Sequence, residues 1–498
     1  MRKSGVLMAI SSLPGKYGIG CFSKEAYKFV DDLKDAGQSL WQILPLGPTS
    51  YGDSPYQSFS TFAGNPYYID PEALIDRKWL TNKECESYDW GRDEKRVDYA
   101  RIYDSRFRLL RKAYKRSGIA SDKGFASFVK TNSYWLPDYA LFMALKDAHG
   151  GRSWESWEQG LRIREQSVME KAKQKYAADI EFYEFLQYEF SVEWKQLKKY
   201  ANNKGIEIVG DIPIYVAFDS ADAWAHPGLF EFNDELHPIA VAGCPPDAFS
   251  ADGQLWGNPL YRWDVHKKSG YSWWMKRLKK CFSLYDIVRI DHFRGFDAYY
   301  RIPCPAENAR HGSWVKGPGY ELFETMKKKL GEKQVIAEDL GFLTPSVLRL
   351  VKRTGYPGMK VLQFAFDPRE ESDYLPHNYA KNSVVYTGTH DNDTTLSWYY
   401  DISAGDRRFA AEYLNIPKDT KDKDIPWYFI RTAFASVADT AVIPMQDILS
   451  LPHYARMNHP STIGGNWEWR MKPGAFNASR KSRLKKLTAL YNRAPKKS

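Results

Sequence analysis

Two segments of the chain combine an apolar strand pattern with side chains that exchange protons. In residues 285–295 (YDIVRIDHFRG), Arg289 and Asp291 lie on the same strand face because strand side chains alternate. In residues 335–341 (VIAEDLG), Glu338 directly follows an apolar run. One interpretation is that Arg289 and Asp291 form a buried ion pair with no further role, and such a pair by itself adds little stability. The other interpretation is a pair of carboxylates, Asp291 and Glu338, that cleaves a glycosidic bond while Arg289 keeps Asp291 ionised.

Carboxylates end four of the predicted strands. One strand ends at Asp211, the next at Asp291, a third at Glu338 and Asp339, and a fourth is followed by His390, Asp391 and Asp393. Single members have structural interpretations: Asp339 could be structural, and Asp393 could cap a following helix. Four such ends at one rim are harder to explain by structure, because clustered carboxylates repel one another unless a reaction uses them. The pattern therefore favours an active site.

The spacing of apolar runs and helical segments predicts eight strands that alternate with helices. The predicted strands are 6–10, 39–44, 206–212, 285–291, 335–339, 359–366, 383–389 and 441–445. This alternation is typical of an α/β fold, the (β/α)8 or TIM barrel, whose active site lies at the C-terminal ends of the strands. We expect one catalytic barrel over residues 1–498. A mainly helical insertion is expected at about 71–203, and loop insertions at about 217–261 and 296–319 on the active-site face.

Composition narrows the classes of protein to which the chain can belong. Lys and Arg total 71 against 61 Asp and Glu, so the charges are mixed and do not predict a nucleic-acid partner. Five cysteines without a close pair predict neither disulfides nor a zinc site and are typical of the cytoplasm. We expect no membrane span, metal or cofactor. Aromatic residues make up 15% of the chain, which suits stacking on sugar rings or a large aromatic core.

Longer motifs around these residues resemble a known family. Arg-x-Asp at the fourth strand, Glu at the fifth and His-Asp at the seventh are similar to the α-amylase clan. Within the clan, five motifs resemble the amylomaltases, or 4-α-glucanotransferases: SPYQSFSTFAGNPYYID, PPDAFSADGQLWGNPLY, VRIDHFRG, AEDLG and YTGTHDNDT. The third strand keeps Asp211 but lacks the Asn-His that usually follows in amylases, which fits the amylomaltase branch. The resemblance covers nearly the whole chain and implies a reaction on maltooligosaccharides and other α-1,4-glucans.

The resemblance implies a role for each motif residue. Asp291 would be the nucleophile, and Glu338 would be the general acid and then the base. Asp391 would be the third catalytic carboxylate, with Asp393 as its rival. Sugar or nucleophile contacts would come from Asp211, Arg289 and His390. Because this double displacement retains configuration, the carboxyl groups of Asp291 and Glu338 are expected about 5–5.5 Å apart.

Loops decide whether water or a sugar hydroxyl reaches the intermediate first. The segment 243–261 is expected to be a substrate lid, although a structural loop with a buried tryptophan is the alternative. Its expected substrate contacts are Phe249, Gln254 and Trp256. Tyr56 and Asn458 are further expected contacts, with a core tyrosine and a packing asparagine as the alternatives.

We therefore expect a 4-α-glucanotransferase that moves a segment of an α-1,4-glucan to the 4-hydroxyl of glucose or of another maltooligosaccharide. The alternatives are an α-glucan hydrolase and a non-catalytic glycan-binding protein. The sequence does not indicate an oligomeric state.

Overall fold

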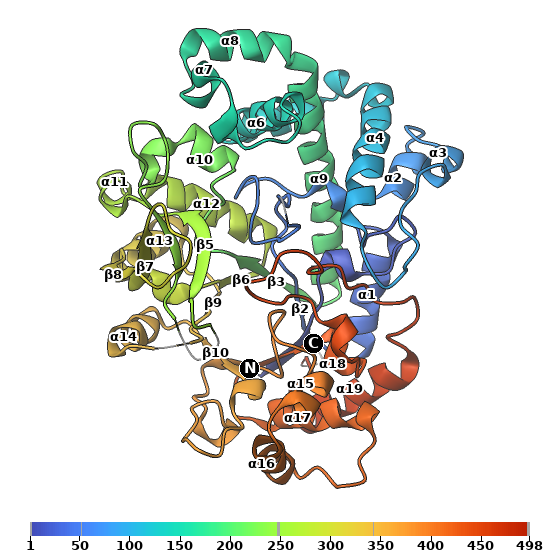
Figure 1. Ribbon diagram of the computed structural model, residues 1–498. Coiled ribbons are helices and arrows are strands. Elements are labelled where there is room, and N and C mark those ends of the chain that lie inside the picture. Colours follow the sequence, from blue (N-terminus) through green and yellow to red (C-terminus); the bar gives the residue numbers. More distant parts are fainter. Residues whose placement is uncertain (1, 51, 247–249, 342, 496–498) are drawn as a thin grey trace.

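Eight parallel strands form a barrel at the centre of the molecule (Figure 1). The structure is a computed structural model that describes residues 2–50, 52–246, 250–341 and 343–495. In sheet order the strands are β10 (Gly358–Val361), β11 (Ser383–Tyr386), β12 (Thr440–Pro444), β1 (Lys3–Leu7), β2 (Leu40–Gln42), β3 (Glu207–Ile212), β6 (Ile287–Ile290) and β9 (Val335–Ala337). The predicted (β/α)8 barrel is confirmed.

The barrel closes between β9 and β10. The Ala337 N–H donates to the Pro357 carbonyl at 3.0 Å, and the Met359 N–H donates to Asp339 Oδ1 at 2.7 Å. Asp339 is therefore a structural residue at this seam, which was one of the two interpretations of its carboxylate.

Burial explains why these short segments become strands. All residues of β6 and β11 are buried, because a parallel sheet is covered on both faces and leaves no alternation of polar residues. Each observed strand overlaps a predicted one, but all except β3 end earlier than predicted. The largest offset is at β10, because the residues after Val361 form a 3-10 turn, Leu362–Phe364, instead of continuing the strand to residue 366. The residues that were predicted to be in strands but lie beyond the observed strand ends form the rim of the barrel.

Helices surround the barrel, and local sequence signals set their ends. Those outside the insertion are α1 (Lys24–Asp35), α10 (Ala221–Ala225), α11 (Trp263–Lys268), α12 (Ser272–Leu284), α13 (Tyr320–Leu330), α14 (Pro345–Thr354), α15 (Thr395–Asp401), α16 (Ala404–Leu414), α17 (Ile425–Ala435), α18 (Met445–Ile448) and α19 (Ala478–Leu490). At α14, the Thr344 side chain caps the start and Gly355 ends the helix with φ 73°. Within the described ranges, no helix has both the length and the apolarity that crossing a membrane requires.

The described residues between β2 and β3 form eight α-helices, and Figure 1 shows them above and beside the barrel. They are α2 (Pro71–Asp76), α3 (Asn82–Glu86), α4 (Tyr99–Ser117), α5 (Lys123–Thr131), α6 (Leu136–Ala148), α7 (Gln159–Arg162), α8 (Gln166–Lys175) and α9 (Ala177–Asn203). The 27-residue α9 leads into β3 and packs Phe190 and Trp194 against Phe22, with ring centres 5.3 Å apart in both pairs. This helix therefore attaches the helical segment to the barrel.

A second sheet, antiparallel and four-stranded, lies beside the barrel (Figure 1). Its order is β5 (Gln254–Pro259), β4 (Ala240–Cys244), β7 (Ala298–Pro303) and β8 (Ser313–Lys316). The prediction of loops at 217–261 and 296–319 is therefore wrong for these four strands. The cause is long-range pairing, since β4 pairs with β7 far along the chain and strand formation depends on such partners.

Candidate active site

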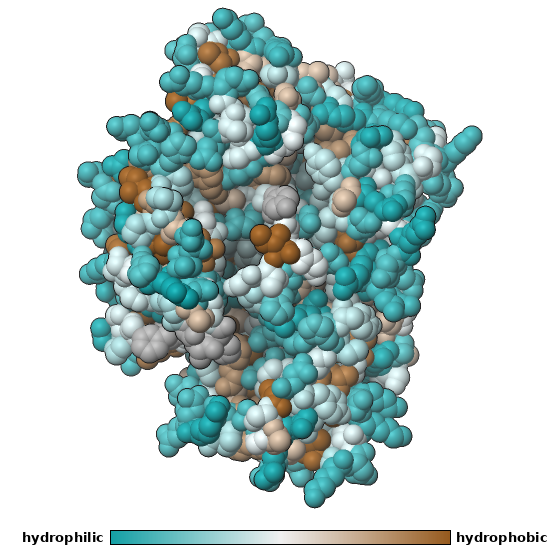
Figure 2. Space-filling model, viewed as in Figure 1, coloured by the Kyte–Doolittle hydropathy of each residue, from teal (hydrophilic) through white to brown (hydrophobic). Residues whose placement is uncertain are grey.

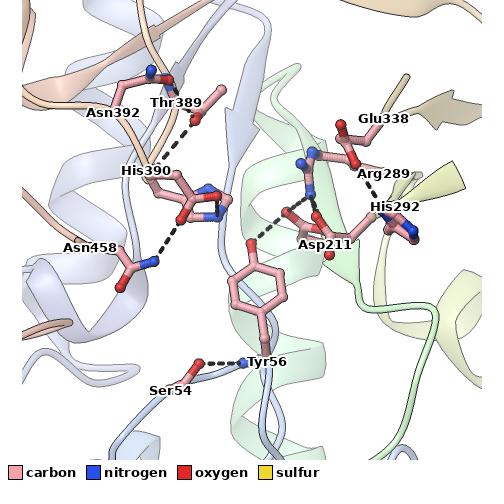
Figure 3. A network of polar contacts seen from close by, with 12 residues as sticks. Ser54, Tyr56, Asp211, Arg289, His292, Glu338, Thr389, His390, Asn392 and Asn458 are labelled. Carbon is pink, nitrogen blue, oxygen red and sulfur yellow. Dashed lines mark hydrogen bonds and ion pairs between the residues drawn. The ribbon is translucent and has the colours of Figure 1, made fainter. Parts of the chain in front are cut away.

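The C-terminal ends of β3, β6 and β9 bring three predicted carboxylates to one rim. Asp211 of β3 stands opposite Arg289 of β6 in the parallel register, and Asp291 follows β6 directly. Glu338 follows β9, and its N–H donates to the Ile290 carbonyl at 3.1 Å. Figure 3 shows this group together with a second group from the β11 side, formed by Thr389, His390, Asn392 and Asn458. Residues far apart in the sequence thus meet in one site.

One guanidinium nitrogen holds two carboxylates. Arg289 Nη1 donates to Oδ1 and Oδ2 of Asp211 at 2.8 and 2.7 Å, and to Oδ1 of Asp291 at 2.9 Å. Arg289 and Asp211 are 3% and 0% exposed, whereas the Asp291 side chain is 29% exposed. Arg289 and Asp211 therefore form a buried ion pair, whereas the buried pair considered from the sequence joined Arg289 to Asp291, whose side chain is partly exposed. Asp291 is the member of the group that remains open to a ligand.

The pKa values of Asp291 and Glu338 are both raised above their ordinary values. Burial is the main cause that raises the pKa of Asp291 to about 6; Arg289 opposes the shift, and the charges of Asp211 and Asp391 add to it. Burial and the charge of Asp291 raise the pKa of Glu338 to about 7. Between these values the favoured form has Asp291 ionised and Glu338 protonated. The expected carboxyl separation of about 5–5.5 Å stays a prediction.

Two backbone N–H groups orient the Glu338 carboxyl. The His292 N–H donates to Oε2 at 2.6 Å, and the Leu340 N–H donates to Oε1 at 2.8 Å. His292 adopts a left-handed conformation with φ 51°, and its ring packs edge-on against Trp256 with centres 4.8 Å apart. Burial lowers the pKa of His292 to about 3, so the ring is neutral near pH 7. Sequence reasoning missed this role of His292, because the residue type gives little signal of a left-handed backbone.

His390 and Asp391 are held from several directions. The Tyr56 ring stacks on the His390 imidazole with centres 5.1 Å apart, and the Tyr56 hydroxyl donates to Asp211 Oδ2 at 2.9 Å. Asn458 Nδ2 donates to Asp391 Oδ1 at 2.7 Å, and the Asn458 N–H donates to the His390 carbonyl at 3.1 Å. The Asp391 side chain is nevertheless 45% exposed. Tyr56 links the two groups of the site (Figure 3).

Asp393, the rival for the third carboxylate, has other contacts. Its side chain is only 10% exposed, and Oδ2 contacts His453 Nδ1 at 2.5 Å. It does not cap α15 either, because the Thr394 side chain does so. Asp391, by contrast, carries a charge that raises the pKa of Asp291. The geometry therefore favours Asp391.

Gln254 and Trp256 lie on strand β5, so this part of the segment 243–261 is a strand and not the predicted loop; its role as a substrate lid stays a prediction. Both side chains are half-buried and alternate with the exposed Leu255, so they share one face of the strand. Trp256 Nε1 donates to Gln254 Oε1 at 3.0 Å. The contact of Trp256 with His292 places this face on the Glu338 side of the site. Phe249 lies outside the described residues.

The site lies on a hollowed face of the molecule, and Figure 2 shows the hollow near the centre of the view. A small cavity of about 20 Å³ borders the β11 side and is lined in part by Met8, His390, Asp447 and Trp469. Within the described part of the chain, no group of three or more His, Cys, Asp or Glu side chains is arranged to hold a metal ion.

Comparisons with known proteins give one consistent result. A family model described as 4-alpha-glucanotransferase matches residues 8–477. A 4-alpha-glucanotransferase of Clostridium butyricum is 48% identical, over 98% of this chain and 100% of its own length. One of Streptococcus pneumoniae is 50% identical, over 99% of this chain and 97% of its own length.

Solved structures agree with these matches. An amylomaltase from Streptococcus agalactiae in complex with acarbose is 42% identical and superposes with a TM-score of 0.96, over 99% of this chain and 100% of that one. An amylomaltase from Corynebacterium glutamicum shares the fold at 18% identity with a TM-score of 0.81, over 98% of this chain and 75% of that one. Full-length similarity to proteins of one description, together with the site geometry, shows that the chain belongs to the 4-alpha-glucanotransferase, or amylomaltase, family.

Proposed function

We propose that the chain transfers a segment of an α-1,4-glucan to the 4-hydroxyl of glucose or of a maltooligosaccharide by a retaining double displacement. The observation that carries this proposal is the pair formed by Asp291 and Glu338. Arg289 binds Asp291 and favours its ionised form, while burial and the charge of Asp291 favour the protonated form of Glu338. A nucleophile and an acid with these forms are what glycoside cleavage needs.

In the first half-reaction, an Asp291 carboxylate oxygen bonds to the anomeric carbon of the donor sugar. The bond from that carbon to the leaving oxygen breaks, and the leaving oxygen takes its electron pair and the proton of Glu338. The two N–H donors from His292 and Leu340 stabilise the carboxylate that Glu338 becomes. The product of this step is a glucosyl ester on Asp291 and a free, shortened glucan.

In the second half-reaction, the 4-hydroxyl of an acceptor sugar gives its proton to the Glu338 carboxylate. Its oxygen bonds to the anomeric carbon while the ester bond to Asp291 breaks, and the electron pair returns to Asp291. Two inversions retain the α configuration. Glu338 ends the cycle protonated and Asp291 ends it ionised, so both groups are ready for another turnover.

The remaining site residues are assigned to sugar binding. Asp391 is the third carboxylate. It accepts hydrogen bonds from ring hydroxyls and stabilises the positive charge that develops at the anomeric carbon. Asn458 holds it in place through the contact at 2.7 Å. The sugar contact beside the cleaved bond comes from the partly exposed Tyr56, on which the buried His390 stacks, whereas the buried Asp211 and Arg289 act by holding Tyr56 and Asp291 in place.

Acceptor binding is assigned to the face of β5. Trp256 offers an aromatic surface and Gln254 a planar hydrogen-bonding group, and both lie on the side of Glu338. A sugar bound here would exclude water from the ester on Asp291, which favours transfer over hydrolysis.

Incubation with maltotriose tests the proposal. Transfer yields glucose together with a ladder of longer maltooligosaccharides, while the total number of reducing ends stays constant. An α-glucan hydrolase would instead raise the number of reducing ends without longer products. Asp291→Asn should abolish turnover and spare glucan binding. A non-catalytic glycan-binding protein would release no glucose from maltotriose even in its wild-type form.

A further inference from the structure

The segment between β11 and α15 carries His390 and Asp391 and is incompletely packed from behind. The small cavity of about 20 Å³ lies against it, lined by five residues of the segment: Thr389, His390, Asn392, Asp393 and Thr394. The ends of β1 and β12 form the other side of this cavity. Because close packing is interrupted here, hydrogen bonds have to fix the position of the segment.

A single carboxylate binds both ends of this segment. Asp447 lies in α18, directly after β12, and is 1% exposed. Its Oδ2 accepts hydrogen bonds from the Thr387 hydroxyl at 2.5 Å and the Thr395 hydroxyl at 2.6 Å. Its Oδ1 accepts the Thr395 N–H at 2.8 Å. Thr387 precedes the segment and Thr395 follows it, so Asp447 fixes the distance between the two ends.

We call the hydrogen bonds that join Asp447 to Thr387 and Thr395 the clamp. Gln363, which follows strand β10, binds the same segment. Gln363 Nε2 donates to the Asp393 carbonyl at 3.0 Å and to the Thr395 hydroxyl at 3.2 Å. Gly388 is needed where the segment passes Gln363, because a Cβ there would lie 2.7 Å from Gln363 Nε2. Asp447 itself borders the cavity, and its partners Thr387 and Thr395 are both fully buried.

We propose that Asp447 is a positioning residue of the transfer reaction, which holds His390 and Asp391 in register with Asp291 by joining Thr387 to Thr395. The proposal rests on the proposed function, because it takes Asp391 to be the third carboxylate. Loss of the clamp lets the segment move into the cavity. Misplacement of a reacting group by about 1 Å costs up to about 100-fold in rate.

Asp447→Ala and Asp447→Asn test the clamp, with glucose release from maltotriose as the assay. We expect Asp447→Ala to lower kcat by about 10- to 100-fold with a smaller change in KM. Asp447→Asn keeps one of the two acceptor oxygens and should lower kcat by only about two- to tenfold. The control is Asp286→Asn: Asp286 Oδ2 accepts the Ile208 N–H at 2.9 Å and Asn202 Nδ2 at 2.8 Å, at the N-terminal rim of the barrel. This control should keep the wild-type kcat.

The pH profile of kcat/KM separates positioning from a general loss of stability. The charge of Asp391 helps to raise the pKa of Asp291, so displacement of Asp391 should move the acid limb to lower pH in Asp447→Ala. The control should keep the acid limb of the wild type. In a background of Asp391→Asn, which removes the group being positioned, Asp447→Ala should lower the rate by less than about threefold.

Folded Asp447→Ala with wild-type kcat and acid limb would overturn the proposal. If Asp447→Ala does not fold, Asp447→Asn is the deciding variant, and its kcat should be about two- to tenfold below that of the wild type. A wild-type kcat together with a wild-type acid limb in Asp447→Asn would then overturn the proposal. Residual activity in Asp391→Asn close to wild type would refute the assignment of Asp391 and with it the proposed site. An inactive Asp391→Asn beside an unaffected Asp447→Ala would refute only the clamp.

Discussion

Glu338→Gln separates the acid role of this side chain from its structural contacts. Glutamine keeps the size of the side chain and an acceptor oxygen for one of the two N–H groups of His292 and Leu340, but has no acidic proton to give at neutral pH. General acid catalysis contributes about 10²- to 10⁴-fold. We therefore expect the turnover of maltotriose to fall by about 10²- to 10⁴-fold, equivalent to about 2.7–5.4 kcal/mol in barrier height.

The assay compares two donors. α-Maltosyl fluoride has a leaving group that departs without protonation, so Asp291 should still form its ester in the variant. Because Glu338→Gln has no base for the second half-reaction, we expect a burst of about one fluoride per active site followed by slow release. The matched control is Asp339→Asn, which alters the adjacent carboxylate at the barrel seam and should retain activity with both donors.

The pH dependence gives a second readout of the same variant. The wild type should lose kcat/KM below about pH 6, where Asp291 gains a proton, and above about pH 7, where Glu338 loses its own. Glu338→Gln should lose the basic limb and keep the acid one. Equal loss of rate with maltotriose and with the fluoride donor, or a maltotriose rate within tenfold of wild type, would refute the assignment of Glu338 as the acid.

Three further predictions follow from the contacts of the site and of the helical insertion. Tyr56→Phe keeps the ring stacked on His390 but loses the hydrogen bond to Asp211, so kcat/KM for maltotriose should fall by about 10- to 100-fold; an unchanged value would show that this bond is not used. Arg289→Ala leaves the fully buried Asp211 without its counter-charge, so urea denaturation should show a loss of about 3–5 kcal/mol in the free energy of unfolding; a loss below about 1 kcal/mol would contradict this expectation. Burial raises the pKa of Glu193 well above its ordinary value, so the wild type loses stability as the pH rises above about 4.5 towards the folded-state pKa. Glu193→Gln has no such loss, and its thermal midpoint should exceed that of the wild type by about 1–3 °C at pH 8 but not at pH 4; an equal difference at both values would contradict this reasoning.

The sequence by itself determined the barrel and most of the site. Apolar runs that end in Asp211, Asp291, Glu338 and His390 encode both a buried strand and a polar rim, because strand burial is a local property of composition. All four residues lie at the rim of the observed barrel. Membership of the family also followed from motifs of consecutive residues and is confirmed by matches along the whole chain.

The tertiary structure decided what depends on partners distant along the chain. The pairing of β4 with β7 turned two predicted loops into a sheet, and the contacts of Asn458 with Asp391 and of His453 with Asp393 added a structural reason to prefer Asp391, as the motif had implied. The His292 N–H donates a hydrogen bond to Glu338 because the His292 backbone is left-handed, and the residue type did not predict that conformation. Local periodicity fixes which segments become strands and helices, whereas the direction of a polar side chain at a rim is fixed by the hydrogen bonds that other segments bring to it.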